Sequence, residues 1–253
     1  VEAIRRGLRE HASAITVTFD YGSDIFEEVS GVVDRWVEAA LAETENPAEG
    51  DYIRYQYGGY MYNCSDTYDG RWHYTVELIP DYYTYPSQER QVTEEVQRLL
   101  GEFAFTGHTS DYGKIAAIYD YLCSTVAYDK VHRKNPHAHL KSTAYAALIR
   151  HSATCQGYCA ALYRLLREAG INCRIITGAV EGKETLHAWV IAELGGLYYG
   201  LDPTWDAGRE EYGLFLLGRE DFADHIPAKH FQNDEFSARY PMAEASYVKE
   251  GSK

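Results

Sequence analysis

The stretch TCQGYCAALYRLLREAG at residues 154–170 decides the expected fold of the C-terminal part of this chain. Its apolar residues recur on one helix face, at Tyr158, Ala161, Leu162, Leu165, Leu166 and Ala169. This spacing predicts an amphipathic helix, with Thr154 as a suitable N-cap and Gly170 as a suitable stop. Residues 171–202 predict three strands separated by two turns. The helix therefore leads into an antiparallel sheet, which is an α+β pattern.

Cys155 falls in the first turn of this expected helix. The backbone N–H groups there have no partner within the helix, and the positive end of the helix dipole lies at the same point. Both features favour an anion, so a thiolate would be stabilised there. Gly157 costs a helix about 1 kcal/mol relative to alanine, which indicates the close approach of another backbone or of a substrate. For Cys155 alone, a buried thiol that only fills space is the alternative.

His187 and Asp202 lie on the two strands that flank the expected Gly-Gly turn. A two-residue turn pairs Leu194 with Leu197, and the same register places Thr204 opposite His187. Asp202 then shares a sheet face with His187 as its diagonal neighbour, within side-chain reach. The sequence therefore predicts a carboxylate beside an imidazole, as in a base with its orienting acid. A structural pair in the core is the alternative.

Residues 1–104 are expected to form a tyrosine-rich α/β module, and residues 105–253 a second domain. Periodicity predicts strands at 14–20, 51–62 and 71–79, and helices at 25–42, 92–100, 110–126 and 143–149. Many tyrosines fall between residues 52 and 85, where a sheet with one wet face would suit them. A platform for a carbohydrate or a peptide is the alternative.

The composition excludes some partners. Asp and Glu number 38 against 24 Lys and Arg, a formal net charge of −14, so no nucleic acid partner is expected. No apolar run is long enough for a membrane span. The five cysteines form no CxxC pair, and their odd number leaves at least one thiol unpaired. His137 and His139 form an H-x-H in a polar stretch, where a solvated loop is favoured over a metal site.

Three segments together resemble the transglutaminase-like superfamily, especially its bacterial branch of cysteine peptidases. They are TCQGYC at 154–159, LHAWV at 186–190 and LDPTWD at 201–206. The resemblance covers about 105–226, and the segment YGLFLLGREDFADH at 212–225 is part of it. It implies a papain-like, transglutaminase-type α+β catalytic domain, in which a helix packs on an antiparallel sheet, preceded by the small α/β module.

The resemblance also implies roles for individual residues. Cys155 would be the nucleophile, His187 the base and Asp202 the acid that orients the imidazole. The backbone N–H of Cys155 would form part of an oxyanion hole, and Tyr145 is a candidate for the second donor. Asp206 is the alternative acid, although Pro203 is expected to end the strand before it.

Three further residues belong to the same segments. Trp189 and Trp205 would line or support the cleft, and Cys159, where the family commonly has alanine, would pack in the core.

The implied reaction is thiol-dependent acyl transfer on a peptide or isopeptide amide. We expect hydrolysis by a peptidase or amidase; the alternatives are a crosslinking transglutaminase and a non-catalytic module that binds peptide or cell-wall polymer. The expected partner is a protein or peptide substrate, with the cell wall as one setting, and no cofactor or metal is expected. Bacterial members of the family are often exported, so the resemblance implies an extracellular or cell-surface location with a signal removed, and the cytoplasm is the alternative. The start without Met allows this location but does not show it.

Overall fold

The computed structural model describes residues 1–183 and 185–249. The chain divides into two compact units, Val1–Gln88 and Glu89–Lys253, each described separately below. The sequence predicts a boundary at 104/105 between a small module and a catalytic domain. Most of helix α4 (Pro86–Phe103) belongs to the second unit, where Thr93 accepts a hydrogen bond from Arg164 of α7 (Cys155–Glu168). The functional separation of a module from a catalytic domain stays a prediction.

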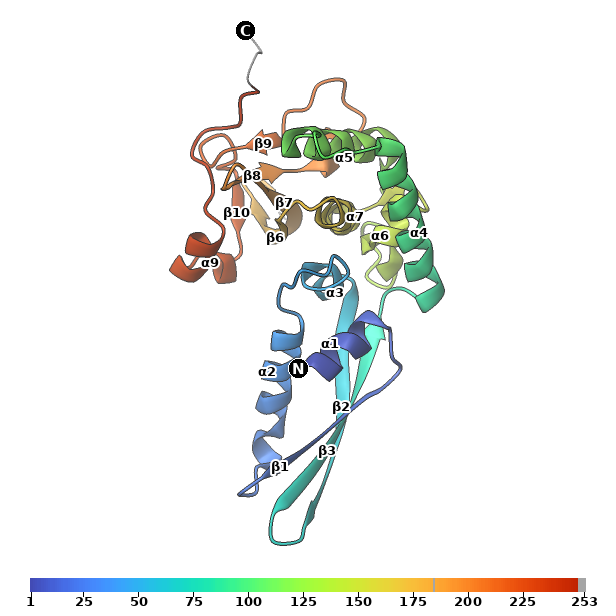
Figure 1. Ribbon diagram of the computed structural model, residues 1–253, viewed down its shortest axis with the longest axis vertical. Coiled ribbons are helices and arrows are strands. Elements are labelled where there is room, and N and C mark those ends of the chain that lie inside the picture. Colours follow the sequence, from blue (N-terminus) through green and yellow to red (C-terminus); the bar gives the residue numbers. More distant parts are fainter. Residues whose placement is uncertain (184, 250–253) are drawn as a thin grey trace. The chain divides into compact units, whose positions relative to one another are not determined.

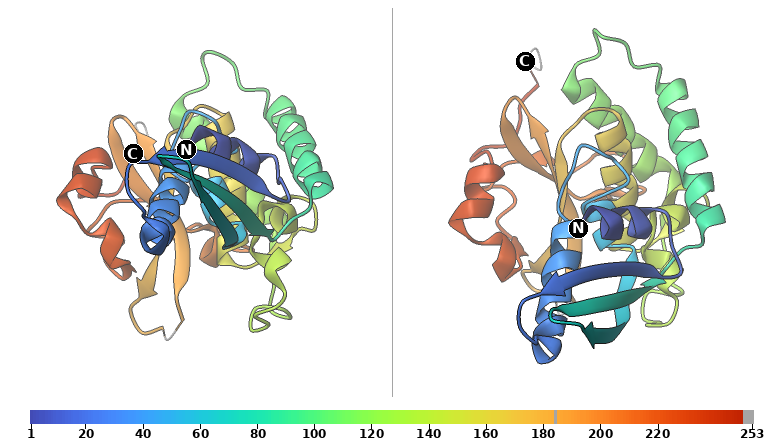
Figure 2. Two further views of the ribbon diagram at one scale, coloured as in Figure 1. Left: turned by 90° about the horizontal axis from the view of Figure 1, so that it is seen from below. Right: turned by 60° about the horizontal axis from the view of Figure 1, so that its bottom comes forward.

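The first unit is built on an antiparallel sheet in the order β1-β3-β2. Its strands are β1 (Ile15–Tyr21), β2 (Tyr57–Tyr68) and β3 (Trp72–Tyr82). Helices α1 (Glu2–Arg9) and α2 (Val29–Ala40), the latter preceded by the short helix η1 (Phe26–Glu28), pack against this sheet (Figures 1 and 2). Their shared core includes Ile4, Val33 and Val76, each fully buried.

The expected strand at 51–62 is wrong over its first residues, which form the short helix α3 (Asp51–Arg54). Gly50 precedes this helix with φ 62°, a backbone conformation that glycine adopts at little cost. The N–H of Asp51 then donates to the Glu43 carboxylate at 2.8 Å, which anchors the first turn. The side chain of Glu43 therefore favours a helix at this position. The spacing of apolar residues along 51–62 carries no information about that contact.

The second unit is built on an antiparallel sheet in the order β10-β6-β7-β8-β9. Its strands are β6 (Cys173–Val180), β7 (His187–Leu194), β8 (Leu197–Leu201), β9 (Phe215–Leu217) and β10 (His225–Pro227). Helix α7 packs on β6 and β7, and α5 (Asp111–Thr125) and α6 (Ala144–Leu148) pack on α7 (Figure 1). The remaining elements are β4 (Ala127–Tyr128), η2 (His139–Ser142), β5 (Ser152–Ala153), α8 (Pro203–Asp206), η3 (Lys229–Phe231) and α9 (Asp234–Arg239).

The register of β7 and β8 is the one that the sequence predicts. Leu194 pairs with Leu197 across the Gly-Gly turn, and the pairing continues to Val190 and Leu201. The strand then stops one residue earlier than expected, because Asp202 becomes the N-cap of α8. Asp202 thus stands at the junction of a strand and a helix, close to the start of β7.

Helix and antiparallel sheet combine in the second unit as the α+β class requires, so the predicted fold class is confirmed. No helix within residues 1–183 and 185–249 combines the length and the apolar character that crossing a membrane demands.

Candidate active site

The start of helix α7 is fixed by contacts of its N-cap residue. Thr154 has an extended backbone, with φ −87° and ψ 176°. Its N–H donates to the Lys141 carbonyl at 2.9 Å, and its hydroxyl donates to the same oxygen at 3.3 Å. The Thr154 side chain therefore does not cap the first turn. The N–H groups of that turn, including that of Cys155, have no acceptor within the helix, and the positive end of the helix dipole at the same point favours an anion.

Gly157 explains how the helix start comes so close to the neighbouring chain. A Cβ atom at this position would lie 2.8 Å from the Lys141 carbonyl oxygen and 3.0 Å from the Thr143 carbonyl oxygen. Any larger residue would push α7 away from the 141–143 segment. The close backbone approach that Gly157 indicates in the sequence is therefore confirmed, and it positions Cys155, which is partly exposed, beside a cleft.

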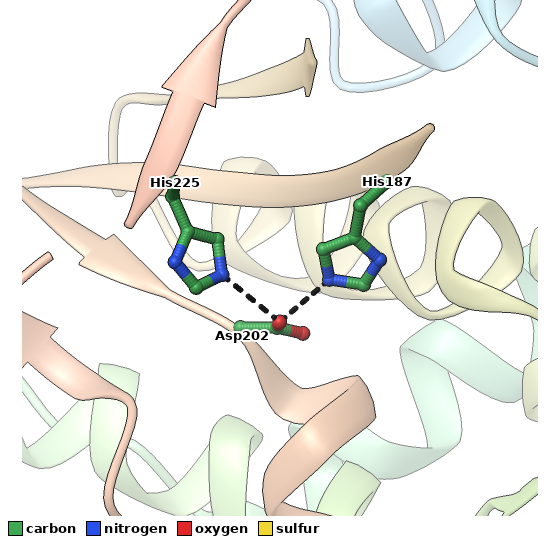
Figure 3. A group of neighbouring side chains, drawn as sticks. All are labelled: His187, Asp202 and His225. Atoms are coloured by element: carbon green, nitrogen blue, oxygen red, sulfur yellow. Dashed lines mark hydrogen bonds and ion pairs between the residues drawn. The ribbon is translucent and has the colours of Figure 1, made fainter. Parts of the chain in front are cut away.

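His187 and Asp202 meet as the strand register predicts. His187 begins β7, and Asp202 follows the last residue of β8. The Nε2 atom of His187 donates to Oδ2 of Asp202 at 2.6 Å (Figure 3). The other carboxylate oxygen of Asp202 accepts the N–H of Thr204 at 3.0 Å, which fixes the plane of the carboxylate. Both side chains are buried, 9% exposed for His187 and 0% for Asp202.

The third member of the predicted set contacts the other side of the His187 ring. Since Nε2 is occupied by Asp202, the hydrogen bond between His187 and the Cys155 side chain uses Nδ1. Burial lowers the pKa of His187, but the hydrogen bonds to Asp202 and Cys155 outweigh it and raise that pKa to about 9. Burial raises the pKa of Asp202, and its hydrogen bonds from His187 and His225 lower it below the usual value. The structure thus brings Cys155, His187 and Asp202 together.

The cleft beside Cys155 has a volume of about 960 Å³. Trp205 forms part of its wall and stacks on His187, with ring centroids 4.8 Å apart and planes 18° apart. Thr204 lines it as well, and the Thr204 hydroxyl is buried without a hydrogen-bond partner among the described residues. The described residues that line the cleft also include Tyr128 from β4 and Leu186, which precedes β7.

Asp206, the alternative acid, serves a different purpose. It is fully buried, and its carboxylate accepts the Tyr119 hydroxyl at 2.8 Å, the Gly213 N–H at 3.0 Å and the Leu214 N–H at 2.8 Å. These bonds connect α8 to α5 and to the segment that enters β9. The carboxylate that contacts His187 is that of Asp202.

The other residues singled out in the sequence lie around this group. Cys159 is fully buried in α7, and burial raises the pKa of its thiol, as expected for a packing residue. Trp189 is buried behind His187, with the two ring centroids 6.3 Å apart. Tyr145 lies on α6 and is not among the described residues that line the cleft.

His225 is a neighbour of this group that the sequence analysis missed. It begins β10, which pairs with β6, and its ring lies beside that of His187, with both rings directed at Asp202 (Figure 3). Its Nε2 lies 3.4 Å from Oδ2 of Asp202, and its Nδ1 lies 2.7 Å from Asp224. One ligand atom each of His187, Asp202 and His225 lie within 4.8 Å of one another, close enough to hold a metal ion. The segment 212–225 is part of the resemblance to the transglutaminase-like superfamily. No rule of helix or strand spacing predicts a contact between residues 225 and 202.

Comparison with known proteins agrees with the motifs. Residues 101–203 match the family model of the transglutaminase-like superfamily, which confirms the resemblance over this segment. A search of the curated proteins gives no match. Among solved structures the chain is similar to a TGase, with 17% identity and a TM-score of 0.42 over 79% of this chain. It covers 52% of that TGase, about half its length.

Two further solved structures are similar to the chain. One is a proposed cysteine protease from Cytophaga hutchinsonii, with 14% identity and a TM-score of 0.40, covering 68% of this chain and 69% of that one. The other is the periplasmic domain of TgpA from Pseudomonas aeruginosa bound to ethylmercury, with 21% identity and a TM-score of 0.36, covering 56% and 59%.

Proposed function

We propose that this protein is a thiol-dependent acyl-transfer enzyme that hydrolyses peptide or isopeptide amides. The observation that carries the proposal is the position of the His187 ring, which contacts the Cys155 side chain on one side and the Asp202 carboxylate on the other. A nucleophile, a base and a group that orients the base are the parts that covalent catalysis requires. The match of residues 101–203 to the transglutaminase-like superfamily supports the same chemistry.

In the first half of the reaction, Nδ1 of His187 takes the thiol proton of Cys155, the sulfur attacks the amide carbonyl carbon, and the carbonyl electron pair moves onto oxygen. The N–H of Cys155, at the open end of α7, would donate to this oxyanion. His187, protonated at Nδ1, then gives its proton to the leaving amine nitrogen as the C–N bond breaks. The product is a thioester on Cys155 and a free amine.

In the second half, water attacks the thioester carbonyl while Nδ1 of His187 takes a proton from it. The C–S bond breaks and releases the acid, and Nδ1 returns the proton to the sulfur, so Cys155 and His187 regain their starting state. Asp202 holds the His187 tautomer throughout, because its Oδ2 accepts the Nε2–H bond and leaves Nδ1 as the ring nitrogen available to Cys155. Cys155 is partly exposed in an open cleft, so water can reach the thioester.

Alkylation of Cys155 by iodoacetamide tests the nucleophile. We expect Cys155 to react near neutral pH much faster than Cys64, Cys123 and Cys159, and Cys155→Ser to lose the fast phase. The Cys64→Ser variant is a matched control, because Cys64 is also partly exposed, and it should keep the fast phase. Labelling of Cys155 at the rate of Cys64 would favour a non-catalytic peptide-binding module.

A second assay separates hydrolysis from crosslinking, since both pass through the same thioester. A glutamine peptide is incubated with the protein, with and without a fluorescent primary amine. Hydrolysis predicts release of ammonia and conversion of glutamine to glutamate in both samples. Incorporation of the fluorescent amine as the main product would show that an amine, and not water, resolves the thioester.

A further inference from the structure

The cleft beside Cys155 carries a charge opposite to that of the chain. The chain as a whole has a formal net charge of −14. The described residues that line the cleft nevertheless include the cations Lys130, Arg133, Lys183 and Arg209, and no aspartate or glutamate is among them. Glu184 lies outside the described residues and is not counted. Acidic residues outnumber basic ones in the sequence, so a cleft of random composition would carry a net negative charge.

Contacts of two of these cations, Lys183 and Arg133, place them close to the reacting groups. The Lys183 ammonium lies 5.7 Å from the centre of the Trp205 ring, which itself stacks on His187. On the β4 side, burial and Cys155 raise the pKa of the Tyr128 hydroxyl, and Arg133 lowers it, so both the thiol and the guanidinium are near that phenol.

The fourth cation is partly neutralised. A guanidinium nitrogen of Arg209 lies 3.7 Å from Asp206, whose carboxylate already accepts three hydrogen bonds. Lys130, Arg133 and Lys183 are exposed. These three therefore supply most of the positive potential that a ligand in the cleft would meet.

We propose that the cleft selects acidic peptide segments, in which carboxylates flank the amide that Cys155 attacks. The proposal rests on the proposed function and names the substrate class of that site. A cleft lined by charge of one sign concentrates ligands of the opposite sign, and added salt screens this effect. A peptide is favoured over a nucleic acid because the rest of the chain repels a long polyanion, and because the chemistry requires an amide.

Alkylation by two reagents of different charge tests this potential. Iodoacetate is an anion and iodoacetamide is neutral, and both alkylate the same sulfur. Replacing Lys130 and Arg133 together by Gln should lower the iodoacetate-to-iodoacetamide rate ratio at Cys155 about threefold or more, and raising the salt concentration should lower it in the wild type. Lys183→Gln should act in the same direction. Lys229→Gln, which removes one cation outside the lining of the cleft, should leave the ratio unchanged.

The iodoacetamide rate alone reports the nucleophile, so the two proposals fail separately. A fast iodoacetamide reaction with a ratio that no cleft variant changes would overturn the acidic-substrate proposal and leave the acyl-transfer proposal standing. Slow reaction of both reagents would overturn the proposed function first.

Protection of Cys155 from iodoacetamide tests the peptide class. Hexaglutamate should slow alkylation in a dose-dependent way, and hexalysine should not. The Lys130→Gln, Arg133→Gln double variant should lose most of the protection. Oligothymidylate that protects as well as hexaglutamate would show that any polyanion suffices and would overturn the assignment to peptides. Equal protection by hexalysine and hexaglutamate would overturn the role of charge.

A second inference comes from His225, whose ring is locked beside Asp202. Phe222 stacks on it with ring centroids 3.8 Å apart and planes 10° apart. Trp189 meets it edge-on at 5.1 Å, and Trp205 lies at 5.3 Å. The ring is buried, and its second nitrogen is held by Asp224 at 2.7 Å. Packing and hydrogen bonding thus leave the His225 ring one orientation, with Nε2 directed at Asp202.

We infer that His225 is a positioning residue that holds the Asp202 carboxylate against His187. Asp202 Oδ2 lies between the two imidazoles, and Oδ1 is held by the Thr204 N–H (Figure 3). With His225 in place, a rotation that moves Oδ2 away from His187 also breaks its contact with His225. This role also rests on the proposed function.

Other groups near Asp202 do not compete for this role. Tyr119 and Cys123 of α5 and Cys159 of α7 are close enough to interact with its charge. Burial raises the pKa of all three, so they stay neutral in the range where His187 and Asp202 titrate.

The pH profile of Cys155 alkylation by iodoacetamide tests the positioning role. His225→Phe keeps the stacked ring but removes the donor, and the acidic limb of the profile should move to higher pH by about half a unit or more. His225→Gln, which can still donate, should restore the limb at least in part. A melting temperature measured for each variant shows that the protein is folded.

Two results would contradict the role. One is a folded His225→Phe protein whose acidic limb coincides with that of the wild type. The other is tight binding of Zn²⁺ to EDTA-treated wild type that His225→Phe abolishes, because His225 would then be a metal ligand.

Discussion

Two histidines of this chain each contact a carboxylate on a sheet, one in each unit, and they differ in what surrounds them. His73 on β3 lies 2.7 Å from Asp20 and 2.7 Å from Asp69, and its side chain is 39% exposed. His187 on β7 lies 2.6 Å from Asp202, and both side chains are buried. The same imidazole–carboxylate contact therefore occurs in water and in the interior. Water screens the first pair, whereas the second has a thiol as its other neighbour.

A contact between an imidazole and a carboxylate is therefore not enough to define a catalytic site. Hydrogen bonds to Asp69 and Asp20 raise the pKa of His73, as those to Asp202 and Cys155 raise the pKa of His187. A raised histidine pKa thus occurs in both units. The second unit adds burial, a fixed ring and a cysteine at the open end of a helix.

The largest expected effect comes from removing the charge of the buried carboxylate. Asp202→Asn should lower the rate of amide hydrolysis by about 10³-fold or more, because the His187 tautomer is no longer held. The measurement is turnover of a peptide amide at saturating substrate. His73→Gln, the equivalent change in the exposed pair, should leave turnover unchanged. An equal loss of turnover in both variants would contradict the view that only the buried histidine takes part in catalysis.

A buried carboxylate without a histidine should matter for stability instead. Asp206→Ala leaves the Tyr119 hydroxyl and two backbone N–H groups without their acceptor. We expect the free energy of unfolding to fall by about 3 kcal/mol, measured by urea denaturation. Asp69→Ala in the exposed pair is the control, with no measurable change expected. A drop in stability under about 1 kcal/mol for Asp206→Ala would contradict this account.

The pH dependence of stability should also separate the two pairs. The folded pKa of His187 is about 9, above the unfolded value of about 6.5, so the folded state binds more protons in that window. Its contribution is fully present below about pH 6.5 and is lost as the pH rises through about 9. Asp202, whose pKa is lowered, contributes above its unfolded value and loses that contribution as the pH falls through its folded pKa.

The difference in urea midpoint between wild type and His187→Gln should therefore shrink between about pH 6.5 and 9. A difference that stays constant across this range would mean that the His187 proton does not contribute to folding.

The smallest effect is expected at the exposed pair. His73→Gln should change the urea midpoint little at low salt and not at all at high salt, because solvent and ions screen the contacts with Asp20 and Asp69. A midpoint shift that persists in high salt would show that this pair is less solvated than its exposure indicates.

Much of the candidate site could be predicted because it depends on short-range geometry. A period of 3.6 predicted helix α7 and placed Cys155 in its first turn, and a period of two with a Gly-Gly turn placed Asp202 on the face of His187. Both rules act over a few residues, and neighbouring strands are adjacent in sequence. The strand predicted at 51–54 is wrong because a contact outside the segment matters there. The Glu43 carboxylate, eight residues before Asp51, accepts the first N–H of the helix that forms instead.

The sequence by itself thus determined helix α7 and the three strands that follow it, the fold class of residues 105–226 and the candidates Cys155, His187 and Asp202. Only the tertiary structure decided that Asp206 is bound by Tyr119, 87 residues away, that His225 reaches Asp202, and that scattered cations share one cleft. These contacts join segments far apart in the chain. They depend on how helices and sheet pack, and no local period reports that packing.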